Sequence, residues 1–206
     1  MAPTLWAISD LHTGHTGNKP VTESLYPSHP EDWLIVAGDV AERTDDIRWS
    51  LDLLRRRFAK VIWVPGNHEL WTTGKDPAQV FGRARYDYLG EMCDEMGLVT
   101  PEHPYPVWTG QGGPATIVPM FVLYDYTFLP QGATTKAEGL AIAKEHNVVA
   151  TDEFLLSCEP YATRDAWCRD RLAYTRSRLE DLVWMVPTGL VNHFPLVRQP
   201  CDMLFY

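Results

Sequence analysis

Long hydrophobic runs, paired cysteines and an excess of positive charge are all missing from this sequence. No apolar run approaches the ~20 residues of a membrane-spanning helix, and no early stretch resembles a signal peptide. The four cysteines show no short paired spacing such as C-x-x-C, so we expect reduced thiols in a cytoplasmic protein. With a formal net charge of -9, non-specific binding to nucleic acid or to an anionic membrane is unfavourable. Nothing in the sequence indicates an oligomeric state.

The chain is long and apolar enough to form one sizeable core. It has 206 residues, of which 45% are hydrophobic, and we expect a single domain over 1–206. Short apolar runs at 4–9, 33–37 and 60–65 predict buried strands. Between the last two, the spacing of apolar residues over 45–58 predicts an amphipathic helix. Strand, helix and strand form a parallel crossover unit, so the predicted fold class is α/β.

The second half of the chain mixes helical and extended patterns. We expect a helix over 76–97, with Asp76 as its N-cap, Pro77 as its first residue and Gly97 as its end. The remaining predicted elements are a helix near 135–146, a long helix over 163–185 capped by Thr163, one or two strands over 115–128 with a break at Pro119, and a strand over 188–193.

Oxygen- and nitrogen-bearing side chains follow four of the predicted strands. The opening "ISDLH" places Asp10 and His12 two residues apart, which would put them on one side of a strand. The carboxyl ends of parallel strands meet at the edge where open α/β folds bind ligands. Carboxylate, amide and imidazole groups at that edge suit a divalent metal ion. The residues concerned are Asp10 and His12, Asp39 after Gly38, Asn67-His68-Glu69 after Gly66, and Asn192-His193.

Each of these residues also has an ordinary structural interpretation. Asp39 after a glycine could cap a helix, and Asn67 could be a turn residue. His193 could be a hydrogen-bonded core histidine. The conjunction of four such strand ends, in this order, favours a metal site over separate capping roles.

The combination D-x-H, G-D, G-N-H-E and a later strand ending in histidine resembles the calcineurin-like metallophosphoesterases. The resemblance covers the chain from Asp10 to His193. It implies a β-sandwich flanked by helices that holds two divalent metal ions, manganese or iron, with zinc also possible. It implies these roles: Asp10 and His12 bind the first ion, Asp39 bridges both, Asn67 and His193 bind the second, His68 lies beside the phosphate, and Glu69 supports the loop.

More narrowly, the segment from Gly14 to Trp71 resembles the actinobacterial phosphopantetheinyl hydrolases, which remove 4'-phosphopantetheine from carrier proteins. The implied function is a binuclear-metal phosphodiesterase with holo acyl carrier protein as substrate. Two alternatives stay open: a phosphoesterase for a small molecule such as a nucleotide or cyclic nucleotide, and a non-catalytic scaffold. The scaffold is disfavoured because six of the expected site residues are present: Asp10, His12, Asp39, Asn67, His68 and His193. The arginines at 55–57 could form a basic docking surface or simply a solvated helix face.

Three further features bear on the site. Arg43 could contact a phosphate or merely begin a helix, and His15 could line the entrance or lie on a solvated loop. The resembling family closes its site with a later G-H-x-H, which is not found in this sequence. We therefore expect the chain to be truncated before that segment and to bind metal weakly by itself.

Overall fold

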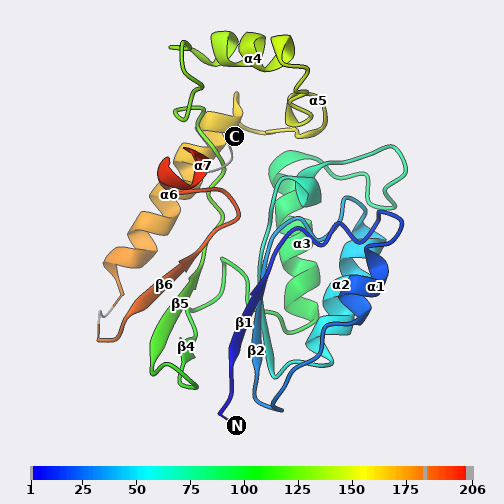
Figure 1. Ribbon diagram of the computed structural model, residues 1–206, viewed down its shortest axis with the longest axis vertical. Coiled ribbons are helices and arrows are strands. Elements are labelled where there is room, and N and C mark those ends of the chain that lie inside the picture. Colours follow the sequence, from blue (N-terminus) through cyan, green and yellow to red (C-terminus); the bar gives the residue numbers. More distant parts are fainter. Residues whose placement is uncertain (1, 183–184, 203–206) are drawn as a thin grey trace.

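The computed structural model describes residues 2–182 and 185–202. Two three-stranded sheets pack against each other, and helices lie on both outer sides (Figure 1). This is the helix-flanked β-sandwich that the family resemblance implies, whereas the residue patterns alone predicted only an α/β sheet. In the part of the chain that the structure describes, no helix is long and apolar enough to cross a membrane.

The first sheet is parallel and contains the three strands nearest the N-terminus. Its strands are β1 (Leu5–Ile8), β2 (Trp33–Ala37) and β3 (Lys60–Val64), in that order. The crossover helix α2 (Thr44–Arg55) joins β2 to β3 and lies with α1 (Lys19–Glu23) and α3 (Gly82–Glu95) on the outer face (Figure 1). Ile47, Leu51 and Leu54 of α2 recur at three- or four-residue steps and are fully buried against this sheet.

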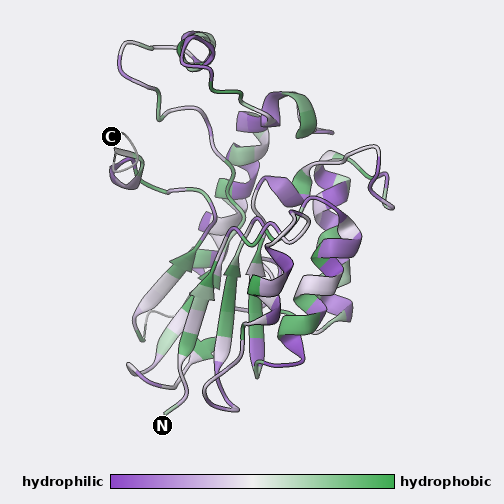
Figure 2. Ribbon diagram, turned by 45° about the vertical axis from the view of Figure 1, so that its right-hand side comes forward, coloured by the Kyte–Doolittle hydropathy of each residue, from purple (hydrophilic) through white to green (hydrophobic). Residues whose placement is uncertain are grey.

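The second sheet is mixed and closes the core. β5 (Ala115–Pro119) lies between β4 (Val107–Trp108), which is antiparallel to it, and β6 (Thr188–Val191), which is parallel. The two sheets meet through Ile35 and Ile62 on one side and Trp108 and Ile117 on the other. Helix α6 (Arg164–Glu180) covers the outer side, and the strands between the helix layers are largely apolar (Figure 2).

Two predicted elements were wrong in extent. The helix expected over 76–97 begins at Gly82, because Asp76 is not an N-cap of this helix. The Asp76 side chain is instead buried, where it accepts hydrogen bonds from Thr44 and Arg85. Of the extended stretch 115–128, only residues up to Pro119 form a strand; beyond it the Asn192 side chain pairs with the backbone of Val122.

Other boundaries agree with the sequence. Thr163 caps α6, which ends at Glu180; residues 183–184 of the helix expected over 163–185 lie outside the described residues. Helix α4 (Lys136–Glu145) begins with a capping box formed by Thr135 and Glu138. Among the described residues, four short helices were not predicted: α1, the 3-10 helix η1 (His68–Leu70), α5 (Asp152–Leu155) and α7 (Gln199–Asp202). Helices α4 and α5 lie together at one end of the molecule (Figure 1).

Candidate metal centre

Asp10 and His12 lie in the loop after β1 rather than in the strand itself. Their backbones have φ values of 56° and 42°, so the expected strand alternation is the wrong reason for their proximity. The loop is held by hydrogen bonds from the Asp10 N–H to the Gly38 carbonyl (3.0 Å) and from the His12 N–H to the Asp39 carbonyl (2.9 Å). The two side chains still meet, with His12 Nε2 lying 3.9 Å from Asp10 Oδ1.

Three imidazoles converge on one carboxylate oxygen of Asp39. Asp39 Oδ2 lies 3.8 Å from Nε2 of His12, 3.8 Å from Nε2 of His68 and 3.5 Å from Nε2 of His193. These separations are longer than a typical hydrogen bond. The His12 and His193 separations suit two ligands of one ion, because ligands about 2.1 Å from a metal lie about 3–4.2 Å apart, depending on the angle between them. Donor atoms of Asp10, Asp39 and His193 all lie within 4.8 Å of one another. The residues therefore fit a divalent metal ion.

Two glycines make room for the Asp39 carboxylate. A Cβ on Gly66 would lie 2.0 Å from Asp39 Oδ1, so no larger residue fits there. Gly38 has a φ of +90°, and a Cβ there would lie 2.7 Å from His193 Nδ1. The G-D and G-N-H motifs thus place backbone where side chains would displace the candidate ligands.

Glu69 joins the loops that carry these ligands. Its fully buried carboxylate accepts hydrogen bonds from the backbone N–H groups of Asp39 (3.0 Å), Val40 (2.7 Å) and Gly66 (2.9 Å). Burial and the nearby Asp39 charge raise the pKa of Glu69 to about 7. The side chain thereby ties the ends of β2 and β3 together.

His193 reaches the site from the second sheet. Its Nδ1 is hydrogen-bonded to the Ala37 carbonyl at 2.8 Å, which turns Nε2 towards Asp39. The edge is therefore built by two sheets, whereas a single parallel sheet was expected. Burial opposes protonation of this ring, but the Asp39 carboxylate outweighs it and raises the pKa of His193 to about 9. In turn, although the burial of Asp39 acts in the opposite direction, the hydrogen bond and charge of His193 lower the pKa of Asp39.

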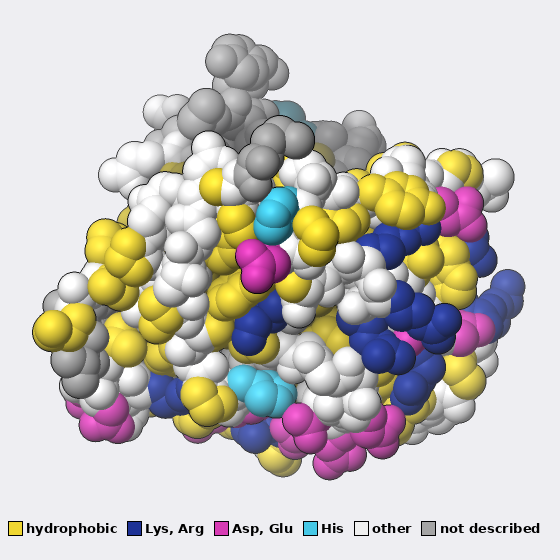
Figure 3. Space-filling view, turned by 90° about the horizontal axis from the view of Figure 1, so that it is seen from below, with side chains coloured by type: hydrophobic (Ala, Val, Ile, Leu, Met, Phe, Trp, Pro, Cys, Tyr) yellow, Lys and Arg dark blue, Asp and Glu magenta, His cyan; other side chains and the backbone are white. Residues whose placement is uncertain are grey.

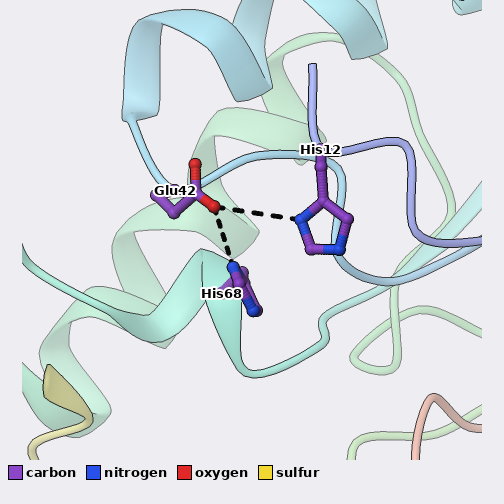
Figure 4. A group of neighbouring side chains, drawn as sticks. All are labelled: His12, Glu42 and His68. Carbon is purple, nitrogen blue, oxygen red and sulfur yellow. Dashed lines mark hydrogen bonds and ion pairs between the residues drawn. The ribbon is translucent and has the colours of Figure 1, made fainter. Parts of the chain in front are cut away.

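Glu42 is a site residue that the sequence analysis missed. Its Oε1 lies 2.8 Å from His68 Nδ1 and 3.8 Å from His12 Nδ1 (Figure 4). It follows Asp39 by three residues in the same loop, and this G-D-x-x-E spacing is the signal that could have found it. Although burial opposes ionisation, the bond to His68 lowers the pKa of Glu42.

Of the two candidate substrate residues, Arg43 bonds within its own helix start, whereas His15 contacts the site through Glu42. Arg43 precedes α2 and donates two hydrogen bonds to Asp45, at 3.0 and 2.6 Å, as expected of a residue that begins the helix. His15 is 65% exposed and lies 3.5 Å from Glu42, at the rim of the site.

Asn67 is held by a residue far away in the sequence. Its Nδ2 donates to Asp152 Oδ1 at 2.9 Å, and Asp152 also accepts from Trp71 Nε1 (2.6 Å) and the Tyr124 hydroxyl (2.5 Å). No local pattern marks Asp152, which lies in the stretch of mixed character between the second sheet's strands.

A cavity of about 360 Å³ opens beside Asn67 and His68. One side of the cavity is formed by aromatic side chains, and the other side is formed by residues 149–153, where α5 begins. The remaining lining residues are Trp71, Tyr124, Tyr126, Val149, Ala150, Thr151, Asp152 and Glu153.

The comparisons with known proteins agree with this geometry. The model of the calcineurin-like phosphoesterase family matches residues 3–195. The [acyl-carrier-protein] phosphodiesterase PptH of Mycobacterium tuberculosis is 83% identical over 204 residues, which are 99% of this chain; the chain spans 63% of that relative's length. The crystal structure of phosphopantetheinyl hydrolase (PptH) from Mycobacterium tuberculosis superposes with a TM-score of 0.95 at 83% identity, covering 99% of this chain and 72% of the other. The chain belongs to the calcineurin-like phosphoesterase family.

Proposed function

We propose that this chain carries the catalytic site of a metal-dependent phosphodiesterase that releases 4'-phosphopantetheine from holo acyl carrier protein. The observation that carries the reaction class is the convergence of three imidazoles on Asp39, beside Asp10. The substrate is proposed from the relative named as an acyl-carrier-protein phosphodiesterase.

Five residues would hold the two divalent ions, for which manganese or iron suits the donors best and zinc is possible. Bound ions of this kind neutralise phosphate oxygens and lower the pKa of the attacking water. Asp39 would be shared between them, and the neutral Asn67 would leave more of the ions' positive charge to the phosphate. The proposed ligands are Asp10, His12, Asp39, Asn67 and His193.

His68 would protonate the leaving serine oxygen. Glu42 binds its Nδ1 at 2.8 Å, which leaves Nε2 directed towards the Asp39 side of the site. Nε2 is therefore the ring nitrogen that would carry the proton to the leaving oxygen, a role that typically contributes about 10²–10⁴-fold to the rate.

The test of the substrate uses the full-length gene product loaded with manganese. Holo and apo carrier proteins are incubated with it separately, and mass spectrometry follows both. The holo carrier should lose the mass of phosphopantetheine, whereas the apo carrier and any mixture with Asp39→Asn protein should not change. An enzyme that hydrolyses simple diesters but leaves the holo carrier intact would keep the reaction class and exclude this substrate.

A further inference from the structure

We infer that the cavity beside Asn67 and His68 binds the pantetheine arm of the substrate. This inference rests on the proposed function and adds where each half of the substrate lies.

Size separates the two substituents of the phosphodiester. One is a serine on a folded carrier protein, and the other is a narrow chain of amide and methylene groups. A cavity of about 360 Å³ is in the range of small-molecule sites and cannot admit a folded protein. Because the cavity adjoins Asn67 and His68, a phosphate at the metal edge can extend only its narrow substituent into it.

The chemistry of the lining also fits an uncharged chain. Among the described residues that line the cavity, none is Lys or Arg, and the charged ones are Asp152 and Glu153. The nearby cations, Lys136 and Arg164, are each already paired with Glu153 at 2.9 Å. A second phosphate would therefore meet carboxylates without an unpaired cation, which disfavours a nucleoside polyphosphate. Tyr124 and Tyr126 give their hydroxyl hydrogens to these two carboxylates, so their rings are fixed as an apolar wall. Neutral amides and methylenes of a pantetheine chain meet no uncompensated charge on such a wall.

A pair of tryptophan substitutions tests the assignment. Ala150→Trp fills the cavity from its lining, whereas Val148→Trp adds the same bulk at an exposed neighbour outside it. Full-length, manganese-loaded enzyme is assayed on holo carrier protein and on bis(p-nitrophenyl) phosphate, which has no pantetheine arm. We expect Ala150→Trp to raise KM for the holo carrier by about tenfold or more relative to the small diester. Val148→Trp should change neither KM substantially.

Each other outcome is decisive. If Ala150→Trp leaves KM for the holo carrier unchanged, the arm lies elsewhere and the proposed function survives. If Ala150→Trp raises KM equally for both substrates, the substitution has disturbed the metal edge itself. The smaller change Ala150→Leu is then measured, and an equal effect on both substrates would exclude binding of the arm at this wall. If the wild-type enzyme does not cleave holo carrier, the proposed function itself fails.

A different observation supports a second inference. The structure assigns to Asp152 the positioning of the Asn67 amide for metal binding, on the premise that Asn67 is a ligand. Asp152 can only accept from Asn67, so the NH2 group must face it and the amide oxygen must face away. Its other two hydrogen bonds, from Trp71 and Tyr124, fix the carboxylate itself. Outer partners of this kind typically change metal affinity by 10–100-fold when removed.

The readout is manganese binding to apo protein by calorimetry and electron paramagnetic resonance. Asp152→Leu should weaken one of the two sites by about 10–100-fold, and Asp152→Asn, which keeps an acceptor, by less. Tyr124→Phe removes a different bond to the same carboxylate, so it should lower stability but weaken metal binding much less than Asp152→Leu. Asp125→Asn, which changes an exposed carboxylate that accepts hydrogen bonds from Thr127, is the matched control. Equal affinities in Asp152→Leu and this control would overturn the assignment.

Discussion

At the scale of single residues, His68 is where proton transfer can be separated from charge stabilisation. Its Nδ1 is engaged by Glu42, so Nε2 is the atom available to a leaving oxygen. His68→Ala should slow diesters with alkyl leaving groups by about 10²–10⁴-fold. The p-nitrophenolate leaving group needs little protonation, so the hydrolysis rate of p-nitrophenyl diesters should fall much less. Steady-state rates on both substrate types check this, and equal losses would remove His68 from the acid role.

Asp39 is the residue whose change tests the proposed metal site most directly. Asp39→Asn keeps the shape of the side chain but removes a charge that faces three imidazoles. We expect loss of at least one ion and of nearly all turnover, measured by elemental analysis and diester hydrolysis. Asn67→Ala should affect one ion preferentially. Asp87→Asn, at an exposed ion pair with Arg83 on α3, is the control and should retain both ions. Two ions and full activity in Asp39→Asn would contradict the ligand assignment.

At the scale of elements, Arg85 connects α3 to both loops of the site. Its fully buried side chain pairs with Asp76 (3.1 Å) and donates to the carbonyls of Glu69 (2.5 Å) and Glu42 (2.8 Å). Removing one partner of a buried pair leaves an uncompensated charge, so Arg85→Met should lower the free energy of unfolding by about 3–5 kcal/mol. Urea denaturation measures this. Arg83→Met, which removes a partly exposed ion pair on the same helix, should lower the free energy of unfolding by about 1 kcal/mol or less.

Asp32 fixes the start of β2 at the end of the sheet opposite the site. Burial alone would raise its pKa, but hydrogen bonds from Thr4, Trp6, Ser28 and His29 hold the pKa well below its usual value. A lowered folded-state pKa stabilises the fold above the ordinary carboxyl pKa of about 4, and that stability is lost as the pH falls below it.

The resulting expectation concerns the pH dependence of stability. Between about pH 6 and pH 3, wild-type protein should lose more stability than Asp32→Asn protein, because the variant has already lost the ionised acceptor. Urea denaturation of both proteins at the two pH values provides the comparison. Parallel losses in the two proteins would show that Asp32 does not contribute.

At the scale of the whole molecule, the sequence patterns predicted single elements better than the way these elements assemble. Hydrophobic spacing is a local signal, so α2 and the first three strands were predicted almost to their ends. The buried position of Asp76 was not predicted, because its partner Arg85 becomes adjacent to it only on folding. Asp152 was not identified for the same reason, because its contacts with Asn67 and Tyr124 span 85 and 28 residues of sequence. Glu42 was within reach of the sequence, three residues from Asp39.

For the proposed carrier-protein substrate, the arrangement of the whole molecule limits where the carrier could dock. Helix α2 begins beside the site and runs 12 residues, about 18 Å, to Arg55 at the opposite end of the strands. Arg55 and Arg56 both pair with Asp52, and Arg57 donates to the carbonyls of Glu23 and Leu25. Figure 3 views this end, where Lys and Arg side chains gather on the side of α1 and α2. A docking role for the arginines at 55–57 is therefore disfavoured.

In the proposed reaction, the bond to be cleaved joins the carrier's serine to phosphorus, so the carrier surface would approach the metal edge and not the far end of α2. The double variant Arg55→Gln/Arg56→Gln should accordingly leave KM for holo carrier protein within about twofold of wild type, even at low ionic strength, where charge effects are largest. Steady-state kinetics at two salt concentrations measure it. A rise of about tenfold that disappears in high salt would instead show that the carrier contacts this basic end, and would require a binding path around the side of the first sheet.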